Sequence, residues 1–579
     1  MEIQPFISNG NWNVKIKEGN RIVTLHSIDP YQEARRITEH FNPSFGYVLV
    51  AGMGLGYLVE YLIKNTNYSV FVFEHTKEII ELAKEKRGLD KILFSSRLKI
   101  FHNENDLFDF LDENFIKEFN YYINRQYASL FPEIYQSFAG HITAYLSRKH
   151  INQSTLKRFQ KVWLRNIVKN SFFYFDLPGI VDITHNFTGK PAVIVGAGPS
   201  LMNNIEVLKE LQDNVIIIST DTAYLQLVKS SIMPDFIVSV DPQEKNSLYV
   251  TGVFTKNCPF LVIDSAVSFL TLVNYPQDRI IIYDTIFPLY EILSRFWGSK
   301  GKLKCGGSVS TTAFDLARFF GCNPVIFVGQ DLAFSSFKTH SSLNLLENIF
   351  LYKTDRFKNF ETYNSKILVG ADRIEIKGNT TSVVITDRKF LTFLDWFKRE
   401  IKQTSSAVIN ATEGGAYIDG CIHMPLKDVI YKYGIDKKLD KHIEIRKNDL
   451  IQNREAFIKF LKEVFDLVDY LIPFAGRSLE VSMDLLANFE KIKNLAPFFN
   501  KMGEFDKILL DVLKSKKEVG RFIELTMQNV IERILSRGEE DKLTEELIST
   551  WVDFYREAKE GLFYIRHILK KRIRLEERN

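Results

Sequence analysis

The chain has 579 residues, of which 45% are hydrophobic and 25% charged, and its formal net charge at pH 7 is +4. This composition is typical of a folded globular protein and excludes a disordered or fibrous chain. The near balance of charges gives no overall indication of a nucleic-acid partner or an anionic membrane. Because 579 residues exceed what one hydrophobic core holds, we expect about three or four domains of ordinary size.

The cysteines and the N-terminal residues indicate the cellular compartment in which we expect the protein. The cysteines show neither a CxxC pair nor a His/Cys spacing typical of zinc ligands, so we expect free thiols and a reducing environment. The first twenty residues lack the basic start and apolar core of a signal peptide. No apolar run approaches the roughly 20 residues that a membrane-spanning helix needs. We therefore expect a cytoplasmic, soluble protein without membrane insertion.

The first zone, residues 1–185, contains a short β-rich run that ends in GMGLG and is followed by a helical pattern. The next strand ends at Glu74. This predicts an N-terminal Rossmann-like domain with a helical linker, and the motif is similar to motif I of S-adenosylmethionine methyltransferases. Glycines at 52, 54 and 56 allow a ligand to approach the turn closely, and Glu74 can accept ribose hydroxyls. The alternative is that the glycines only let helix and strand pack closely.

The second zone, residues 186–425, alternates helical patterns with six continuous apolar runs: AVIVG, NVIIIST, FIVSV, FLVID, RIIIYD and PVIFVG. Runs that do not alternate with polar residues indicate a parallel sheet covered on both faces. The third zone, residues 426–579, has no strand signal and repeats apolar residues at helical spacing. The predicted fold class is α/β: a Rossmann-like N-terminal domain, a central doubly wound parallel sheet, and an all-α C-terminal domain.

The first strand of the second zone breaks into the turn Gly196-Ala197-Gly198, followed by Pro199 and Ser200. Proline at a first helical position costs nothing because its missing N–H has no partner there, and Ser200 can point its hydroxyl at the turn. The free N–H groups and the dipole of the following helix favour a phosphate. This turn is therefore a candidate anion site.

Other polar residues follow the strands of the same zone. Asp221, Asp241 and Asp331 end three of them, and in an open parallel sheet such ends line the ligand crevice. A second glycine turn precedes a helix rich in Ser and Thr and is a second candidate anion cradle; it comprises Gly306, Gly307 and Ser308. His340, in a loop after a strand, is a candidate general base near neutral pH.

Four motifs in order carry a resemblance: VIVGAGPSL, STDTAYLQLVKSSIMPDFIVSVDP, CGGSVSTTAFDLARFFGCNPVIFVGQDLAFSSFKTH and INATEGGAYIDG. Over about residues 190–425 the chain resembles the motility accessory factor (Maf) family, whose central domain is related to archaeal hydroxymethylpterin pyrophosphokinase-like proteins. The resemblance implies a bacterial flagellin glycosyltransferase. Such an enzyme takes a nonulosonic acid of pseudaminic or legionaminic type from a CMP-sugar donor and transfers it to Ser or Thr of flagellin, its protein acceptor in motility.

The central zone also resembles bacterial sialyltransferases that carry a GNGPSL turn and a later SGxD. Residues Gly196 and Gly198–Leu201 match the first motif, with Ala197 in place of the asparagine, and Gly329 and Asp331 match the second. Residues Gly306–Ser308 fall where those enzymes contact the nucleotide. The resemblance, taken together with the aspartates at the strand ends, predicts a cytidine nucleotide site that comprises Gly196, Gly198, Pro199, Ser200, Asp221, Asp241, Gly306, Gly307, Ser308, Gly329 and Gln330.

The chemistry implied is attack of a protein hydroxyl on the anomeric carbon, with CMP departing. N–H groups around 198–200 and 307–308 are expected to stabilise the leaving phosphate, and His340 and Asp331 are the candidate catalytic residues. The catalytic histidine of the sialyltransferases lies further downstream than His340. Mg²⁺ can be held by the aspartates but is not required. Two alternatives remain: an ATP- and Mg²⁺-dependent pterin diphosphokinase-like enzyme, and a non-catalytic flagellin-binding factor. The oligomeric state stays open.

Overall fold

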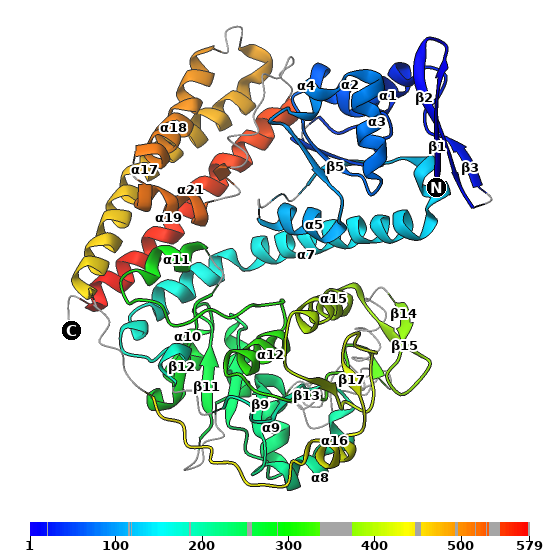
Figure 1. The fold of residues 1–579 in the computed structure, drawn as a ribbon. Coiled ribbons are helices and arrows are strands. Elements are labelled where there is room, and N and C mark those ends of the chain that lie inside the picture. The colour runs from blue at the N-terminus through cyan, green and yellow to red at the C-terminus, as the bar shows by residue number, and fades with distance from the viewer. Residues whose placement is uncertain are drawn as a thin grey trace, which may run out of the picture. The chain divides into compact units, whose positions relative to one another are not determined.

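The protein is described by a computed structural model, which forms two compact units, Met1–Lys157 and Arg158–Asn579 (Figure 1). The described residues are all of 1–579 except 20, 44, 114–115, 117, 184–186, 252–257, 286–287, 336–344, 346–372, 446–452, 493–495, 516, 528–529, 532–544 and 577–579. The predicted α/β fold class is confirmed, since each unit contains a parallel sheet and the C-terminal region is largely helical. Within the described part, no helix is long and apolar enough to cross a bilayer.

The first unit is built on a four-stranded parallel sheet with the order β6-β5-β4-β7. Its strands are β4 (Tyr47–Ala51), β5 (Ser69–Phe73), β6 (Leu98–Phe101) and β7 (Asn120–Ile123). The helices are α1 (Pro30–Glu39), α2 (Tyr57–Asn65), α3 (Lys77–Arg87), α4 (Asp90–Leu93), α5 (Glu104–Glu113), α6 (Arg125–Leu130) and α7 (Pro132–Asn170), which continues into the second unit. An antiparallel sheet that was not predicted precedes them: β1 (Glu2–Ser8), β2 (Asn11–Glu18) and β3 (Arg21–Thr24).

The second unit contains an eight-stranded sheet with the order β12-β11-β10-β9-β8-β13-β16-β17, in which every described pairing is parallel. The strands are β8 (Ala192–Val195), β9 (Ile216–Thr220), β10 (Phe236–Ser239), β11 (Phe260–Ile263), β12 (Ile280–Ile282), β13 (Val325–Val328), β16 (Val408–Asn410) and β17 (Ile422–His423). All residues of the first seven are buried, as the continuous apolar runs predict.

Helices cover both faces of this sheet because successive strand residues point to opposite sides. Ile194 packs in one core with α12 (Val309–Phe319) and α15 (Arg388–Lys402), whereas Val193 and Val195 pack in another with α8 (Leu201–Leu211), α9 (Asp221–Lys229) and α16 (Leu426–Tyr433). Other described elements of the sheet region include α10 (Phe269–Val273), α11 (Pro288–Ser294) and a hairpin, β14 (Ile374–Lys377) and β15 (Val383–Thr386).

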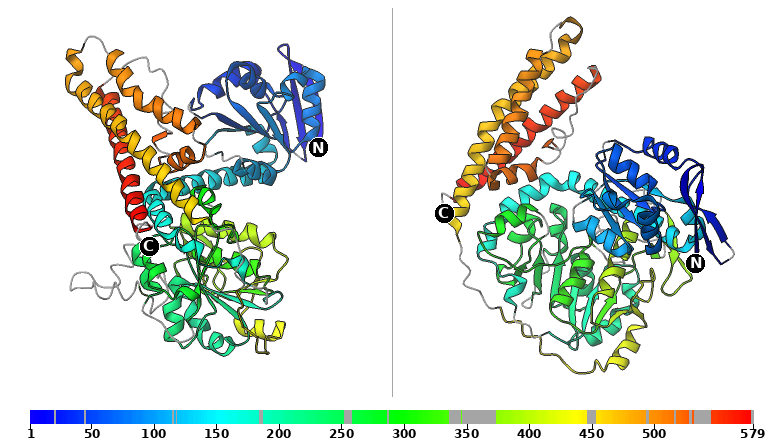
Figure 2. Two further views of the ribbon diagram at one scale, coloured as in Figure 1. Left: turned by 90° about the vertical axis from the view of Figure 1, so that its left-hand side faces the viewer. Right: turned by 45° about the horizontal axis from the view of Figure 1, so that its top comes forward.

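Among its described residues, the C-terminal region contains the helices α17 (Arg454–Asn488), α18 (Ala496–Ser515), α19 (Lys517–Thr526) and α21 (Glu545–Glu576). The two longest, α17 and α21, pack along each other (Figure 2, yellow-orange and red). Their core is continuous with that of the sheet region: the ring of Phe457 lies 5.2 Å from that of Phe172 and 5.6 Å from that of Trp297. The domain limits at 185 and 425 therefore stay predictions, since neither sheet nor helices form an isolated core here.

Candidate nucleotide-sugar site

The strand order of the large sheet contains one reversal, between β8 and β13. From β8 the chain adds β9, β10, β11 and β12 on one side, and it then returns to place β13 and β16 on the other side. Ligands of open parallel sheets bind at such a reversal, outside the carboxyl ends of the strands. Two of the predicted turns, 196–200 after β8 and 329–331 after β13, lie there side by side.

The two turns touch through backbone alone. The amide N–H of Gly198 donates to the carbonyl oxygen of Gly329 at 2.9 Å. A Cβ on Gly198 would lie 2.6 Å from that oxygen and 1.9 Å from Oδ2 of Asp331, and one on Gly196 would lie 2.6 Å from the same carbonyl oxygen. Glycine is therefore required at both positions by close approach rather than by backbone angle.

Asp331 is the polar centre of this contact. Its carboxylate accepts hydrogen bonds from the hydroxyls of Ser200 at 2.5 Å and Ser335 at 2.6 Å, and from the backbone N–H of Ser200 at 3.3 Å. The side chain is 2% exposed, and burial raises the pKa of Asp331 above its usual range. In this arrangement Asp331 holds the turn after β8 in place, while its catalytic role stays a prediction.

This geometry corrects one expectation about the first turn. The N–H groups of Gly198 and Ser200, expected to receive a phosphate, donate instead to Gly329 and Asp331. Moreover, α8 begins at Leu201, so Pro199 precedes the helix and is not its first residue. The physical reason is that the turn after the neighbouring strand β13 supplies the acceptors for these N–H groups.

The second predicted cradle retains free donors. The hydroxyl of Thr311 accepts from the N–H groups of Gly306 at 3.0 Å and Ser308 at 3.4 Å. Gly307, which is exposed and has φ +86°, has no hydrogen-bond acceptor among the described residues, nor do the first two N–H groups of α12. An anion therefore finds free N–H groups and the positive end of a helix dipole at the start of α12.

Side chains connect this cradle to the other turns. The Ser308 and Ser310 hydroxyls lie 3.0 Å apart, and Gln330 donates from Nε2 to the Ser310 hydroxyl at 3.1 Å. Because Gln330 is followed by Asp331, which binds Ser200, an unbroken chain of contacts joins the two cradles. The structure thus brings the residues around 198–200, 306–308 and 329–331 together at one edge of the sheet.

A third turn, residues 411–416 after β16, completes the same wall and was not among the predicted site residues. A Cβ on Gly414 would lie 2.9 Å from Cβ of Ser200. Gly415 has φ +70°, and a Cβ there would lie 2.3 Å from the carbonyl oxygen of Asp331. The sequence signal was present, since ATEGGA follows an apolar strand as the other two turns do.

Polar side chains fix this third turn. Thr412 accepts from the backbone N–H of Gln330 at 3.2 Å. Glu413, a non-glycine residue with φ +55°, accepts at Oε1 from Asn204 Nδ2 at 2.7 Å and from the N–H of Leu426 at 3.0 Å. Strained backbone of this kind persists only where the surroundings enforce it, and it gathers at functional sites.

Asp221 and Asp241 lie at the ends of β9 and β10, on the far side of β8 from β13. Asp221 accepts from the Ser239 hydroxyl and the Thr222 N–H, both at 2.7 Å, and burial raises its pKa to about 7. Asp241 is half-buried and accepts from the N–H of Gln243 at 2.8 Å. Among the described residues, no three His, Cys, Asp or Glu side chains gather as a metal site.

His340 lies outside the described residues, so its place is untested. A described histidine of the large sheet is His423, at the edge strand β17. Its Nδ1 lies 2.7 Å from Oδ1 of Asn379 and its Nε2 lies 2.9 Å from the carbonyl oxygen of Ile418, while its ring stacks on Tyr417. Because both nitrogens are engaged, His423 holds the loop and is not available as a base.

In the first unit, the groups of the glycine loop are bonded to or packed against neighbouring residues. Glu74, expected to accept ribose hydroxyls, is fully buried and accepts from the N–H groups of Met53 at 2.9 Å and Thr76 at 3.1 Å. Burial raises the pKa of Glu74 to about 7. A Cβ on residue 52 would clash with Tyr127, and one on residue 54 with His26. The close-packing alternative therefore describes these glycines, and Glu74 does not face a ribose site.

Comparisons with known proteins bear on the fold of the chain. Residues 165–337 match the family described as 6-hydroxymethylpterin diphosphokinase MptE-like. A solved Maf glycosyltransferase from Magnetospirillum magneticum AMB-1 superposes on 99% of this chain and 90% of that one, with a TM-score of 0.51 and 15% sequence identity. The chain has the Maf fold, with an MptE-like central domain.

Curated relatives of this Maf-fold chain are proteins of Treponema pallidum (strain Nichols), all described as uncharacterised. One is 31% identical over 147 residues, which are 24% of this chain and 67% of that protein. Another is 28% identical over 200 residues, 32% of this chain and 67% of the relative, and a further one is 27% identical over 127 residues, 20% of this chain and 32% of its own length. The first of these identities places the chain and that protein in one family.

Proposed function

We propose that the chain is a glycosyltransferase that transfers a nonulosonic acid, of pseudaminic or legionaminic type, from its CMP-activated form to Ser or Thr of flagellin. The observation that carries the proposal is the meeting of three glycine turns and the N-terminus of α12 at the reversal of the large sheet. The Maf fold over the whole chain supports the reaction class.

In the proposed reaction, the acceptor hydroxyl oxygen forms a bond to the anomeric carbon. The bond from that carbon to the phosphate oxygen breaks, and CMP leaves with the electron pair while the hydroxyl proton passes to a base. The growing negative charge is stabilised by the free N–H groups at Gly307 and the first turn of α12, because fixed dipoles there need no reorganisation. In this proposal the half-buried Asp241 binds hydroxyl groups of ribose or sugar. Asp221 is 1% exposed and its carboxylate already accepts from Ser239 and Thr222, so it joins the ends of β9 and β10 instead.

The decisive experiment is intact-mass analysis of flagellin co-expressed with and without this protein in a strain that makes CMP-nonulosonates. We expect a mass increase of one or more nonulosonic acid residues only when the protein is present. A catalytically silent control is the chain with Gly198→Ala, whose added Cβ cannot fit beside Asp331. Unmodified flagellin in every combination, with the protein and the donor both present, would refute the proposal.

The match of residues 165–337 favours one other candidate, a diphosphokinase acting on a hydroxymethylpterin. That reaction needs ATP, Mg²⁺ and carboxylates free to hold the metal near the phosphates. The carboxylate that contacts the turn after β8 belongs to Asp331, and its oxygens already accept hydrogen bonds from Ser200 and Ser335. Release of AMP from ATP in the presence of 6-hydroxymethylpterin would favour this candidate, and its absence together with CMP binding would favour the glycosyltransferase.

A non-catalytic flagellin-binding factor would have crevice charges that are satisfied by salt bridges instead of facing an open pocket. In the structure, Asp331 and Asp221 are hydrogen-bonded by hydroxyl and N–H groups, and no ion pair involves either of them among the described residues. Intact-mass analysis of flagellin distinguishes this candidate from the glycosyltransferase, because a binding factor leaves the mass of flagellin unchanged.

A further inference from the structure

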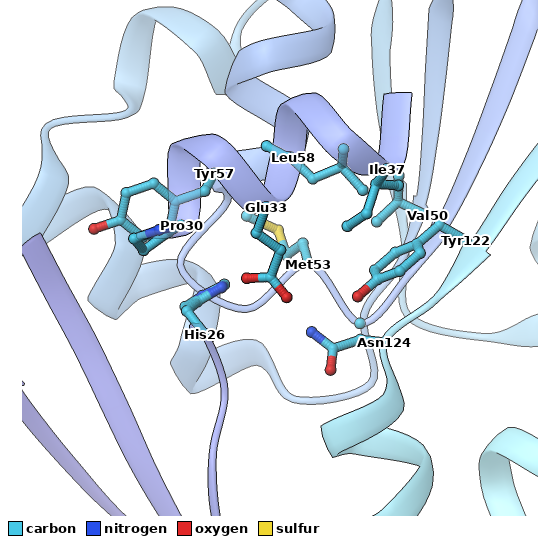
Figure 3. A pocket seen from close by; sticks show the side chains of 12 residues that line it. His26, Pro30, Glu33, Ile37, Val50, Met53, Tyr57, Leu58, Tyr122 and Asn124 are labelled. Atoms are coloured by element: carbon cyan, nitrogen blue, oxygen red, sulfur yellow. The ribbon is translucent and has the colours of Figure 1, made fainter. Parts of the chain in front are cut away.

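The first unit contains a hollow that the proposed function does not use. It lies where α1 covers the carboxyl ends of β4 and β7 (Figure 3). The polar tips of His26, Glu33, Tyr122 and Asn124 converge on it, and its walls are otherwise apolar, with Ile37 on one side. The four-stranded sheet also reverses between β4 and β7, so the hollow occupies the ligand position of an open parallel sheet.

Asn124 supplies unused donors. Its Oδ1 accepts from the N–H groups of Gln126 at 2.9 Å and Tyr127 at 3.3 Å, which fixes the amide so that Nδ2 points away from them. Nδ2 has no hydrogen-bond partner among the described residues, although the side chain is only 5% exposed. Nδ2 itself keeps some exposure to solvent, so it is open to a ligand that accepts a hydrogen bond.

His26 supplies another donor. Its Nε2 accepts from the N–H of Leu55 at 2.8 Å, which assigns the ring proton to Nδ1. Burial lowers the pKa of His26 to about 3, with the charge of Arg87 as a second cause, so the ring is neutral in ordinary conditions. The histidine therefore presents one N–H and no charge to the hollow.

Glu33 supplies the charge. Its Oε2 accepts from the N–H of Ser27 at 3.1 Å, and no cation lies within ion-pair distance of it among the described residues. Burial, with the Glu33 carboxylate as a second cause, raises the pKa of Tyr122 to about 12, so that hydroxyl is protonated. The hollow thus carries one negative charge from Glu33 and three neutral donors, from His26, Tyr122 and Asn124.

These groups restrict the chemistry of the occupant. Phosphate is disfavoured, because Glu33 repels it and the nearby N–H groups of Met53 and Leu55 are bound to Glu74 and His26. A simple cation would pair with Glu33 but would leave the Asn124 donors without an acceptor. A small group with a cation and an acceptor side by side satisfies both, and the hollow has room for only a few heavy atoms.

We propose that this hollow binds the zwitterionic head of a free α-amino acid, with the ammonium on Glu33 and the carboxylate on Asn124 Nδ2 and His26 Nδ1. This site is separate from the crevice of the large sheet and does not depend on the proposed glycosyl transfer.

Calorimetric titration of the full chain tests the proposal, with L-alanine, L-valine and L-leucine as probes. We expect binding of at least one of them, and loss of that binding for the N-acetyl derivative, which lacks the ammonium, and for the methyl ester, which lacks the carboxylate. Glu33→Gln keeps an acceptor for Ser27 and is expected to weaken binding at least tenfold. Asn124→Asp keeps the acceptor for residues 126 and 127, removes the donors, and is expected to abolish binding.

Glu39→Gln is the matched control, because Glu39 lies on the same helix and pairs with Arg35 at the surface. It is expected to bind as the unsubstituted chain does, and circular dichroism melting of all variants establishes that each is folded. No heat from any probe at millimolar concentration would overturn the proposal. Binding that survives both Glu33→Gln and Asn124→Asp would overturn it as well, since the site would then lie elsewhere.

Discussion

The hydroxyl of Ser200 donates to Oδ2 of Asp331 at 2.5 Å, although 131 positions separate the two residues in sequence. This bond joins the turn after β8 to the turn after β13 at the point where the strand order reverses. The candidate site therefore depends on both β8 and β13 and on their being neighbours in the sheet. The predictions below test how much depends on this junction and on the helix beside it.

Ser200→Ala should destabilise the second unit by about 1–3 kcal/mol, because the nearly buried carboxylate of Asp331 loses a hydroxyl donor. Urea unfolding followed by circular dichroism measures the change as a lower midpoint. Ser335→Ala removes the other hydroxyl donor from a half-buried position and should cost less. Equal midpoints for Ser200→Ala and the unsubstituted chain would contradict this view of the junction.

Gly198→Ala should abolish binding of CMP. The new Cβ would lie 1.9 Å from Oδ2 of Asp331 and 2.6 Å from the Gly329 carbonyl oxygen, so the two turns must separate. Calorimetric titration with CMP measures the loss. Gly140→Ala is the control, because nothing lies within 4 Å of a Cβ there and alanine favours the helix. CMP affinity that is unchanged in Gly198→Ala would place the nucleotide elsewhere.

Ser308→Asp should separate helix stability from ligand binding. Asp is a good N-cap and its charge suits the positive end of α12, so stability should stay the same or rise by up to about 1 kcal/mol. The same charge occupies the position proposed for the phosphate, so CMP affinity should fall at least tenfold. Ser308→Asn, a neutral cap of the same size, should retain most of the affinity. Tight CMP binding by the aspartate variant would remove α12 from the site.

Asp221 should make stability pH-dependent. Its pKa is raised by burial from 3.8 to about 7, so the folded chain favours the protonated form. The contribution is fully favourable below pH 4 and is lost as the pH rises to about 7, a change on the order of 4 kcal/mol. Asp221→Asn, which can still accept from the Thr222 N–H, should lack this component. Thermal melts should therefore show the variant gaining stability over the unsubstituted chain between pH 4 and 7, with a constant difference above. If stability changed with pH in the same way for Asp221→Asn and the unsubstituted chain, this prediction would be wrong.

The sequence predicted the central strands well because their apolar runs are continuous, and the structure buries every residue of β8, β9 and β13. It did not predict β1 to β3, most of whose residues are exposed or half-buried. It also proposed Glu74 as a ribose ligand, because an acidic residue at that spacing looks the same whether it faces a ligand or the loop beside it. Only the distance of 2.9 Å to the Met53 N–H decides between the two.

Local pattern thus determined where strands end, where glycines are required and that the sheet is parallel, since these follow from burial and backbone freedom within a few residues. The tertiary structure alone decided that the turns after β8, β13 and β16 meet, and which N–H groups remain free for a ligand. The reason is that a hydrogen bond is decided by which acceptor lies about 3 Å away. Strand order sets that distance between residues 198 and 329 or 200 and 331, and no short stretch of sequence encodes strand order.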